Sequence, residues 1–351
     1  MIWIDILTPK QAWLLGTLAR QLRKENIEVV ISARDHGETC RILEIQELQF
    51  SVVGKHGGAG LEGKLRATTS RILNLLDFLK EIKDSISCFV SHSSPSGVRT
   101  AFGLGIPVIS SLDAPHAEAV ARLTLPLSDY VLTPKAFSLE RYIKIGARSE
   151  SIVQYDGIDE IAWISQLKPN QNLLKELNFS ESDMIVLFRP AETHATYLKG
   201  ITTQLIRELP VIQAIQTNFP EIKIVGFPRY PEQKKLMEEI KGIIIPQTPI
   251  DAPSLMTKAA LVISGGGTMI RESALLGIPS LSMFPSYLIE VEQFLISKGL
   301  PLWYLPDLDE ASTKVLEILK NPQEFMVNST EIIKEMENPI QVLVRLIKEF
   351  R

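Results

Sequence analysis

The sequence contains few cysteines and no long apolar run. Its two cysteines, Cys40 and Cys88, lie in apolar surroundings and lack CxxC spacing. This excludes the disulfide framework of a small secreted protein and favours a reducing cytoplasm. No stretch reaches the roughly 18 uninterrupted apolar residues of a membrane span. The first residues, MIWIDILTPK, lack a basic leader, which argues against a signal peptide.

The sequence also lacks an excess of positive charge. Its formal net charge is −4, so we expect no general attraction for nucleic acid and no nucleic-acid partner. Hydrophobic residues make up 45% of the chain and charged residues 22%, which is typical of a globular protein with substantial cores. A length of 351 residues favours two domains of ordinary size.

Short apolar runs alternate with amphipathic stretches along the chain. This pattern predicts an α/β fold with two doubly wound, Rossmann-like parallel sheets that carry helices on both faces. Strands are predicted at residues 2–6, 28–32, 50–53, 86–90, 107–111, 130–133, 184–188, 222–227, 242–245, 260–264 and 279–284. A helix is predicted within residues 64–83, and the face expected to be buried consists of Leu65, Ile72, Leu75, Leu76 and Leu79.

A segment with few periodic apolar positions, VQYDGIDEIAWISQLKPNQN, separates the two halves. It predicts a boundary near residue 160, with domains over 1–160 and 161–330 and a C-terminal helix over 331–351. Two such domains are expected to face a central cleft. In open α/β sheets ligands bind beyond the carboxyl ends of the strands, so residues directly after a strand are the first candidates for a site.

Three consecutive glycines follow the predicted strand at 260–264. Gly265, Gly266, Gly267 and Thr268 open a predicted helix, whose first N–H groups are unsatisfied and partly positive. Glycines remove the side chains that would keep a phosphate away, so an anion is the natural occupant. Glu272 lies one turn further on and could accept hydrogen bonds from ribose hydroxyls. The simpler interpretation is a tight turn, although three glycines in a row exceed what a turn requires.

This predicted phosphate site matches neither familiar nucleotide motif. Ile270 stands where the dinucleotide fingerprint needs its third glycine, and the G-K-[ST] of a Walker A loop is absent. Arg189, after the predicted strand at 184–188, could neutralise a pyrophosphate held by the glycines. A surface pair between Arg189 and Glu192 is an equally good explanation of that arginine.

Titratable side chains follow the predicted strand at 107–111. The segment SSLDAPHAEAVARLT places Asp113, His116 and Glu118 within six residues, an arrangement suited to acid–base chemistry in a cleft. Alternatively, Asp113 caps the next helix and Glu118 complements its dipole. The five histidines all lie in predicted loops, and His92 closely follows a predicted strand. No pair of them has the spacing of a zinc site, so we expect no bound metal and no cofactor.

Several motifs resemble one microbial family. They are the runs ARDHGET, GKHGGAGLEGKL, AFGLGIPVIS, HAEAVARLTLPLSD and GGGTMIRESALLGIP, which together span nearly the whole chain. On these runs the sequence is identified as a member of the uncharacterised family named domain of unknown function 354. That family belongs to the two-Rossmann GT-B group, together with UDP-N-acetylglucosamine 2-epimerases and the glycosyltransferase that makes the lipid intermediate of peptidoglycan. The resemblance implies a UDP sugar as substrate.

The resemblance also implies which residues bind the nucleotide. In both comparison enzymes the C-terminal domain holds UDP with a glycine-containing helix start and a glutamate one turn on. The matching positions here are Gly266, Gly267, Thr268 and Glu272. The domain over 161–330 would therefore bind the nucleotide sugar, and the domain over 1–160 would supply the acceptor and catalytic side.

The N-terminal half resembles the family group less closely. In the epimerases, a segment similar to PVISSLDAPHAEAVARLT carries two catalytic acids, which would fall on Asp113 and Glu118. A further acid of those enzymes is replaced here by Ser93 or Ser94. The first loop of the family often contains histidines, and Gln11 and Trp13 are among the residues that stand there in this chain.

Three functions follow from these observations. The first is a glycosyltransferase of surface polysaccharide or glycoconjugate synthesis, in which Gly265 to Thr268 and Arg189 stabilise the departing diphosphate and Asp113, His116 or Glu118 takes the acceptor proton. The second is a 2-epimerase of UDP sugars. The third is a non-catalytic sugar-nucleotide-binding protein. The basic residues Lys64, Arg66, Arg71, Lys80 and Lys83 would permit a lipid-linked acceptor at the inner membrane surface, although a solvated helix is the better explanation of them. The sequence leaves the oligomeric state open.

Overall fold

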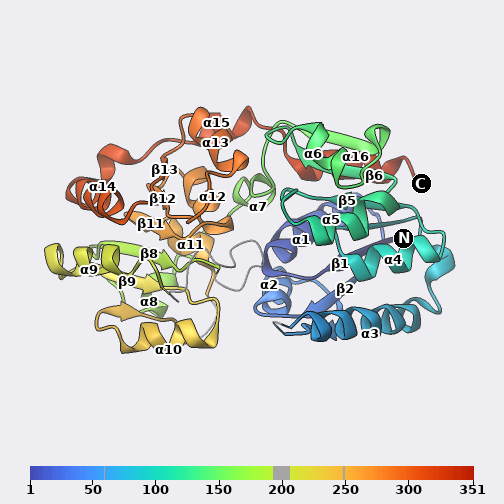
Figure 1. Cartoon of the computed structure of the whole chain (residues 1–351), viewed down its shortest axis with the longest axis horizontal. Helices are drawn as coiled ribbons and strands as arrows, with labels where there is room; N and C mark the ends of the chain where they lie inside the picture. Colours follow the sequence, from blue (N-terminus) through green and yellow to red (C-terminus); the bar gives the residue numbers. More distant parts are fainter. Residues whose placement is uncertain (59, 193–205, 248–249) are drawn as a thin grey trace. The chain divides into compact units, whose positions relative to one another are not determined.

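The computed structural model describes residues 1–58, 60–192, 206–247 and 250–351. The chain divides into two compact units. The first contains Met1–Trp163 together with Met336–Arg351, and the second contains Ile164–Glu335 (Figure 1). The chain thus leaves the first unit, forms the second and returns to the first.

The first unit contains a seven-stranded parallel sheet in the order β3-β2-β1-β4-β5-β6-β7. The strands are β1 (Ile2–Ile6), β2 (Val29–Asp35), β3 (Ser51–Lys55), β4 (Cys88–Ser91), β5 (Val108–Ser111), β6 (Tyr130–Pro134) and β7 (Ile152–Tyr155). The helices are α1 (Pro9–Lys24), α2 (Thr39–Ile45), α3 (Leu61–Leu79), α4 (Pro95–Gly103), α5 (Glu118–Thr124), α6 (Leu139–Lys144) and α16 (Pro339–Lys348), with α7 (Ile161–Ile164) at the junction between the units. The order is that of a doubly wound sheet, in which the strand sequence reverses beside β1.

The second unit contains a six-stranded parallel sheet in the order β10-β9-β8-β11-β12-β13. The strands are β8 (Ile185–Arg189), β9 (Lys223–Gly226), β10 (Ile243–Ile244), β11 (Leu261–Ser264), β12 (Ser280–Ser282) and β13 (Leu302–Tyr304). The helices are α8 (Leu173–Glu176), α9 (Leu209–Asn218), α10 (Pro231–Glu239), α11 (Ala252–Met256), α12 (Thr268–Leu275), α13 (Glu290–Ser297), α14 (Leu308–Lys320) and α15 (Thr330–Lys334). Two parallel-sheet α/β domains were expected, and this prediction is confirmed.

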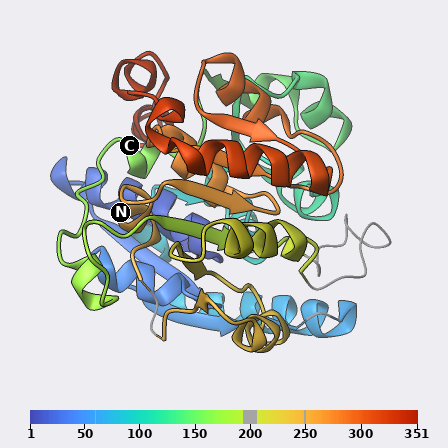
Figure 2. The same cartoon turned by 90° about the vertical axis from the view of Figure 1, so that its left-hand side faces the viewer.

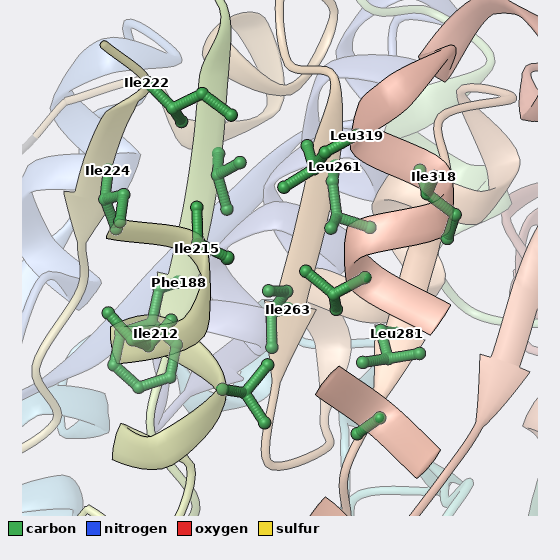
Figure 3. Packing of buried hydrophobic residues seen from close by; sticks show 14 of the residues in the cluster. Phe188, Ile212, Ile215, Ile222, Ile224, Leu261, Ile263, Leu281, Ile318 and Leu319 are labelled. Carbon is green, nitrogen blue, oxygen red and sulfur yellow. The ribbon is translucent and has the colours of Figure 1, made fainter. Parts of the chain in front are cut away.

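Apolar runs explain why both sheets are buried. Figure 2 shows α9 and α14 side by side over one face of the second sheet. Ile212 and Ile215 of α9 and Ile318 of α14 pack there against Phe188 and Ile263 of the strands (Figure 3). Strands covered on both faces read as continuous apolar runs, which is how the sequence revealed them.

The prediction for the helix at 64–83 was wrong about its buried face. Leu75 and Leu79 of α3 are buried, but Leu65 and Leu76 are exposed and Arg71 is buried instead. The cause is Asp5, a fully buried carboxylate on β1. Its two oxygens accept hydrogen bonds from Arg71 at 2.6 and 2.9 Å, so the guanidinium must enter the core beside it.

Further contacts surround this buried ion pair. Ser32 and Ser94 each donate a hydrogen bond to Asp5 at 2.6 Å, and Arg71 also donates to the carbonyl of Val53 at 2.7 Å. Burial alone would raise the pKa of Asp5. The charge of Arg71 and the hydrogen bonds from Arg71, Ser32 and Ser94 outweigh burial and hold the pKa below its ordinary value.

Two short strands at the sheet edges were not predicted from the sequence. The sequence pattern missed β7 and β13, whose few residues are only partly buried. Among the described residues no helix is both long enough and apolar enough to span a membrane.

Candidate functional site

Segments that follow three strands at the carboxyl edge of the first sheet bring charged side chains together. Lys10 follows β1, Asp113 follows β5, and Asp159 and Glu160 follow β7. The ammonium Nζ of Lys10 bonds to Asp113 and, at 2.7 Å, to Asp159 Oδ2, and it lies 3.9 Å from Glu160 Oε1. Asp113 is 8% exposed and Asp159 only 2%, so Asp113 is the more accessible carboxylate.

His92, in the loop after β4, joins this cluster. Its Nε2 lies 3.2 Å from Asp113 Oδ1, and its Nδ1 lies 2.8 Å from the hydroxyl of Ser111. An ionised carboxylate only accepts hydrogen bonds, so the consistent tautomer carries its proton on Nε2 and accepts from Ser111 at Nδ1. The next residue, Ser93, has φ +52°, a strained left-handed conformation that is often found at functional sites.

Neighbouring side chains fix the cluster in place. Gln11 donates to the carbonyl of His92 at 3.0 Å and accepts from the Leu7 N–H at 2.7 Å. Gln11 thus holds the loop after β4 against the loop after β1. Tyr155 donates to Asp159 at 2.6 Å, and burial together with the charge of Asp159 raises the pKa of Tyr155 far above its ordinary value. The phenol therefore stays protonated and remains a donor.

The charge of the cluster decides what it can hold. Within the part of the chain that the structure describes, three carboxylates, those of Asp113, Asp159 and Glu160, lie near the ammonium of Lys10, so carboxylates outnumber ammonium groups there. Such a cluster suits sugar hydroxyls and proton transfer and would repel a phosphate. His92, Asp113 and Asp159 also offer atoms within 4.8 Å of one another, a spacing that could hold a metal. The ammonium of Lys10 binds both aspartates and competes for the same oxygens.

The other predicted acid–base residues lie differently. Glu118 is the first residue of α5, its side chain is 62% exposed, and its carboxylate pairs with Arg122 at 3.3 Å. His116 is half-buried in the preceding loop. The structure therefore brings Asp113 together with His92 and Lys10, and Glu118 together with Arg122. Ser94, which stands near the position of an epimerase acid, caps α4 and donates to Asp5.

The three glycines of the second unit follow β11 as predicted. Gly266 and Gly267 have φ angles of +98° and +103°, which side-chain-bearing residues rarely adopt. A Cβ at Gly265 would overlap Ala191 and the carboxyl of Glu208. Backbone conformation and packing thus account for every glycine of the run. The expectation that three glycines exceed what the turn requires was wrong.

The same turn still has the features of an anion site. α12 begins at Thr268 after the N-cap Gly267, so its first N–H groups face the glycine turn. Arg189 ends β8, and its carbonyl accepts from the Gly265 N–H at 3.1 Å. Arg229, after β9, donates to the carbonyl of Gly266 at 3.0 Å. The backbone of Arg189 and the guanidinium of Arg229 therefore adjoin the turn, and Arg229 was not among the residues predicted from the sequence.

Two acidic residues are buried near the glycine turn. Glu272, in α12, is 6% exposed. Glu208 is fully buried, one of its oxygens accepts from the Ala191 N–H at 3.2 Å, and the other has no hydrogen-bond partner within the described ranges. Burial raises the pKa of Glu208 above its ordinary value. His194, one of the five histidines in predicted loops, lies outside the described residues.

Sequence reasoning missed several of these residues although one rule could have found most of them. Lys10, Ser111, Asp159 and Arg229 all lie at or shortly after the carboxyl end of a strand, the same criterion that selected Asp113. Asp159 was hidden because the sequence pattern did not reveal β7. Lys10 was hidden because its partners lie 103 and 149 positions away in the chain.

Comparisons with known proteins agree with this architecture. The family described as "Protein of unknown function (DUF354)" matches residues 1–351. An uncharacterised protein of Methanocaldococcus jannaschii, MJ0665, is 33% identical over 302 residues, which cover 85% of each chain. Two solved structures share the fold at low identity. UDP-GlcNAc 2-epimerase from Neisseria meningitidis, bound to UDP-GlcNAc, has a TM-score of 0.72 and 16% identity, and 98% of this chain and 100% of that chain are covered. The M. jannaschii UDP-GlcNAc 2-epimerase, in complex with UDP-GlcNAc and UDP, has a TM-score of 0.73 and 18% identity, with 99% of both chains covered. The two sheets thus form a fold of the GT-B type.

Proposed function

Because this chain belongs to the DUF354 family and has the fold of enzymes solved with UDP sugars, we propose that it is a glycosyltransferase that uses a UDP sugar to build a surface polysaccharide or glycoconjugate. The two units have separate roles in this proposal. The glycine turn of the second unit binds the diphosphate, and the acidic cluster of the first unit handles the acceptor hydroxyl.

The observation that carries the catalytic part is the arrangement around Asp113. Lys10 and His92 both donate to this carboxylate, which is the more accessible aspartate of the cluster. Its position makes Asp113 the carboxylate best placed to accept a proton from an acceptor hydroxyl. The Asp113 carboxylate sets the tautomer of His92, Ser111 donates to its Nδ1, and His92 in turn orients Asp113. Asp113 is the proposed base, and Lys10 and His92 are positioning residues.

The glycine turn would hold the diphosphate as its bond to the sugar breaks. The N–H groups that begin α12 and the guanidinium of Arg229 would supply the positive charge that stabilisation of a departing diphosphate requires. Arg189, whose carbonyl bonds to the Gly265 N–H, would add a second guanidinium. Glu272 would accept hydrogen bonds from the ribose hydroxyls, by analogy with the glutamate of the resembling enzymes. No step of this scheme needs more than one acid–base residue in the first unit.

A 2-epimerase is the second candidate, and the likeness to two 2-epimerase folds favours it. That reaction moves protons on two sides of a sugar carbon and needs a second acid. Glu118 is the residue that would supply this acid by resemblance. Its exposed position and its pair with Arg122 favour the transferase instead.

Turnover assays separate the two candidates and a non-catalytic binder. UDP sugars should raise the melting temperature of the chain, since a ligand that binds the native state stabilises it. Without an acceptor, the sugar should remain unchanged, and UDP should be released only when an acceptor is supplied. Conversion of the UDP sugar without an acceptor would establish the epimerase. Binding of UDP sugars with no turnover under either condition would establish the non-catalytic binder.

Three variants test the assigned residues. Asp113→Asn should reduce turnover about 100-fold or more while UDP-sugar binding persists, because removal of a general base typically costs 10²–10⁴ in rate. Glu118→Gln should retain turnover in a transferase and lose it in an epimerase. Glu44→Gln changes an exposed carboxylate that pairs with Arg41 on α2 and serves as the matched control. Full activity of Asp113→Asn would remove Asp113 from the mechanism.

A further inference from the structure

Two of the sequence runs that resemble the family, ARDHGET and GKHGGAGLEGKL, belong to neither the acidic cluster nor the glycine turn. The first run covers the end of β2 and the loop after it, and the second covers the end of β3 and the start of α3. β2 and β3 are parallel neighbours, so both runs lie at the carboxyl edge of the first sheet. This is the edge at which open α/β sheets bind their ligands.

A cavity of about 680 Å³ lies between the edge strand β3 and helix α3. Lys55, His56 and Gly57 line it where β3 ends. Val52, which is 56% exposed, and Ala67 of α3 contribute apolar surface. The cavity therefore combines a polar, basic end with an apolar wall, as a ligand with a charged group and an organic part requires.

Two glycines bring the loop after β3 against the first turn of α3. A Cβ at Gly57 would lie 2.3 Å from the carbonyl oxygen of Gly63, and a Cβ at Gly63 would lie 2.3 Å from the carbonyl oxygen of Gly57. No side-chain-bearing residue tolerates such distances, so this close approach of the two backbones depends on glycine. It draws Lys64, the next residue of α3, towards the loop that carries Lys55 and His56.

A pair of histidines joins the loops after β2 and β3. His36 stacks on His56, with 4.4 Å between the ring centroids and 21° between the ring planes. The Gly58 N–H donates to His56 Nδ1 at 3.1 Å, so the neutral ring carries its proton on Nε2. The carbonyl of His36 accepts from the hydroxyl of Thr39 at 2.6 Å, which fixes the loop after β2. His56 thus offers an N–H donor at a position that lines the cavity.

Positive charge is in excess around this cavity. Within the described part of the chain, Arg34, Lys55 and Lys64 form no ion pair with a carboxylate, and Arg34 donates instead to the carbonyl of Leu7 at 3.0 Å. Asp35 is the carboxylate without such a pair that lines the cavity. The lining arginines are already neutralised, Arg66 by Glu62 and Arg71 by Asp5. Three cations against one carboxylate leave an excess that matches a doubly charged anion.

Both imidazoles respond to this positive charge. Burial and the charges of Arg34 and His56 lower the pKa of His36 to about 4, and Asp35 opposes them only in part. Burial and the charges of Arg34 and Lys64 lower the pKa of His56. The two rings are therefore neutral at pH 7, and an anion beside them would offset the surrounding charge.

We infer that the cavity between β3 and α3 is a binding site for a phosphate ester, whose phosphate lies beside Lys55 and His56 and whose organic part lies along Val52 and Ala67. A phosphate monoester carries nearly two negative charges and accepts several hydrogen bonds, which the ammonium and imidazole donors satisfy. The site lies in the first unit and shares no residue with the glycine turn or with the proposed base. It therefore stands or falls independently of the proposed function.

Titration of the full chain with phenyl phosphate at fixed ionic strength tests the site. The ring signals of His36 and His56, assigned in NMR spectra with His36→Gln and His56→Gln, report on this cavity. Binding should raise the pKa of both rings, because an opposite charge nearby favours the protonated form. Phenyl phosphate should bind more tightly than inorganic phosphate, and phenol should leave both signals unchanged. Ring signals that respond to neither phosphate, or that respond equally to phenol, would overturn the inference.

Variants of the loop after β3 test the assigned contacts. Lys55→Gln should raise the dissociation constant of phenyl phosphate about tenfold, since it removes a charge-assisted contact from an exposed residue that folding does not need. Lys80→Gln, at the exposed far end of α3, is the matched control and should leave the constant unchanged. Gly57→Ala should also weaken binding, whereas Gly60→Ala, with no atom within 4 Å of the added Cβ, should not. A Lys55→Gln variant that binds phenyl phosphate as tightly as wild type would refute the site.

Discussion

Arg71→Met should be among the most destabilising single changes in the first unit. Arg71 and Asp5 form a buried ion pair with two hydrogen bonds, and both side chains are almost inaccessible to solvent. Removal of one partner of such a pair costs about 3–5 kcal/mol, because the other charge stays buried without compensation. In a unit of this size that corresponds to a fall in melting temperature of about 6 to 20 °C.

Scanning calorimetry is the suitable assay, because two compact units need not unfold in one step. The transition of the first unit should move in Arg71→Met, and the transition of the second should stay in place. Arg66→Met, which removes the exposed partner of Glu62 on the same helix, should shift neither transition by more than about 0.5 kcal/mol in stability.

The pH dependence gives the same experiment a second readout. The pKa of Asp5 is lowered in the folded state, so the stabilisation is present above the ordinary pKa of an aspartate and is lost as pH falls through the lowered value. The difference between wild type and Arg71→Met should therefore shrink in acid. The double variant Asp5→Leu with Arg71→Met should recover much of the loss, since a buried pair can be replaced by apolar groups at little cost. A folded Arg71→Met protein as stable as wild type at neutral pH would refute the reasoning.

Three further expectations concern other parts of the chain. Gly265→Ala should lower the melting temperature of the second unit and abolish its stabilisation by UDP sugars. The control Gly299→Ala, at φ +79° with no atom within 4 Å of the added Cβ, should cost only about 1 kcal/mol of strain. Equal effects of the two changes in calorimetry would contradict the packing argument. Glu208→Gln should increase stability at neutral pH. Burial raises the pKa of Glu208, so the wild type loses stability as pH rises from the ordinary glutamate pKa through the raised value. A melting temperature of the variant below that of wild type at pH 8 would show that the carboxylate is needed. Burial raises the pKa of Cys88 to about 12, so Ellman's reagent should label Cys40 first and Cys88 only after unfolding; rapid labelling of two thiols in the native chain would contradict its burial.

The alternation of apolar runs was enough to predict the fold class, because strands buried on both faces must be apolar throughout. The strands of both sheet centres were found in this way. β7 and β13 were missed because edge strands bury less and contain fewer apolar residues. Local patterns also could not reveal the side of α3 that faces the core. Arg71 is buried to neutralise a carboxylate that lies 66 positions away, and periodicity registers only apolar residues.

The candidate site was predictable to the extent that strand ends mark it. Asp113 was selected by this rule, and the structure adds Lys10, His92 and Asp159 around it. Their convergence depends on strand order, which places β1, β4 and β5 side by side although they are distant in sequence. The role of the glycines needed coordinates for another reason. A Cβ at Gly265 or Gly266 would meet Ala191, Glu208 or Phe284, and such contacts cannot be inferred from the sequence alone.

The return of the chain to its first unit has a consequence for biosynthesis. Residues 336–351 emerge from the ribosome only after the whole second unit, yet α16 packs against α1 and its Lys348 pairs with Glu25 at 2.7 Å. During translation the part of α1 that receives α16 is therefore exposed until these residues arrive. The first unit therefore remains incomplete while the second unit is synthesised, and its exposed apolar surface is open to chaperones during that time.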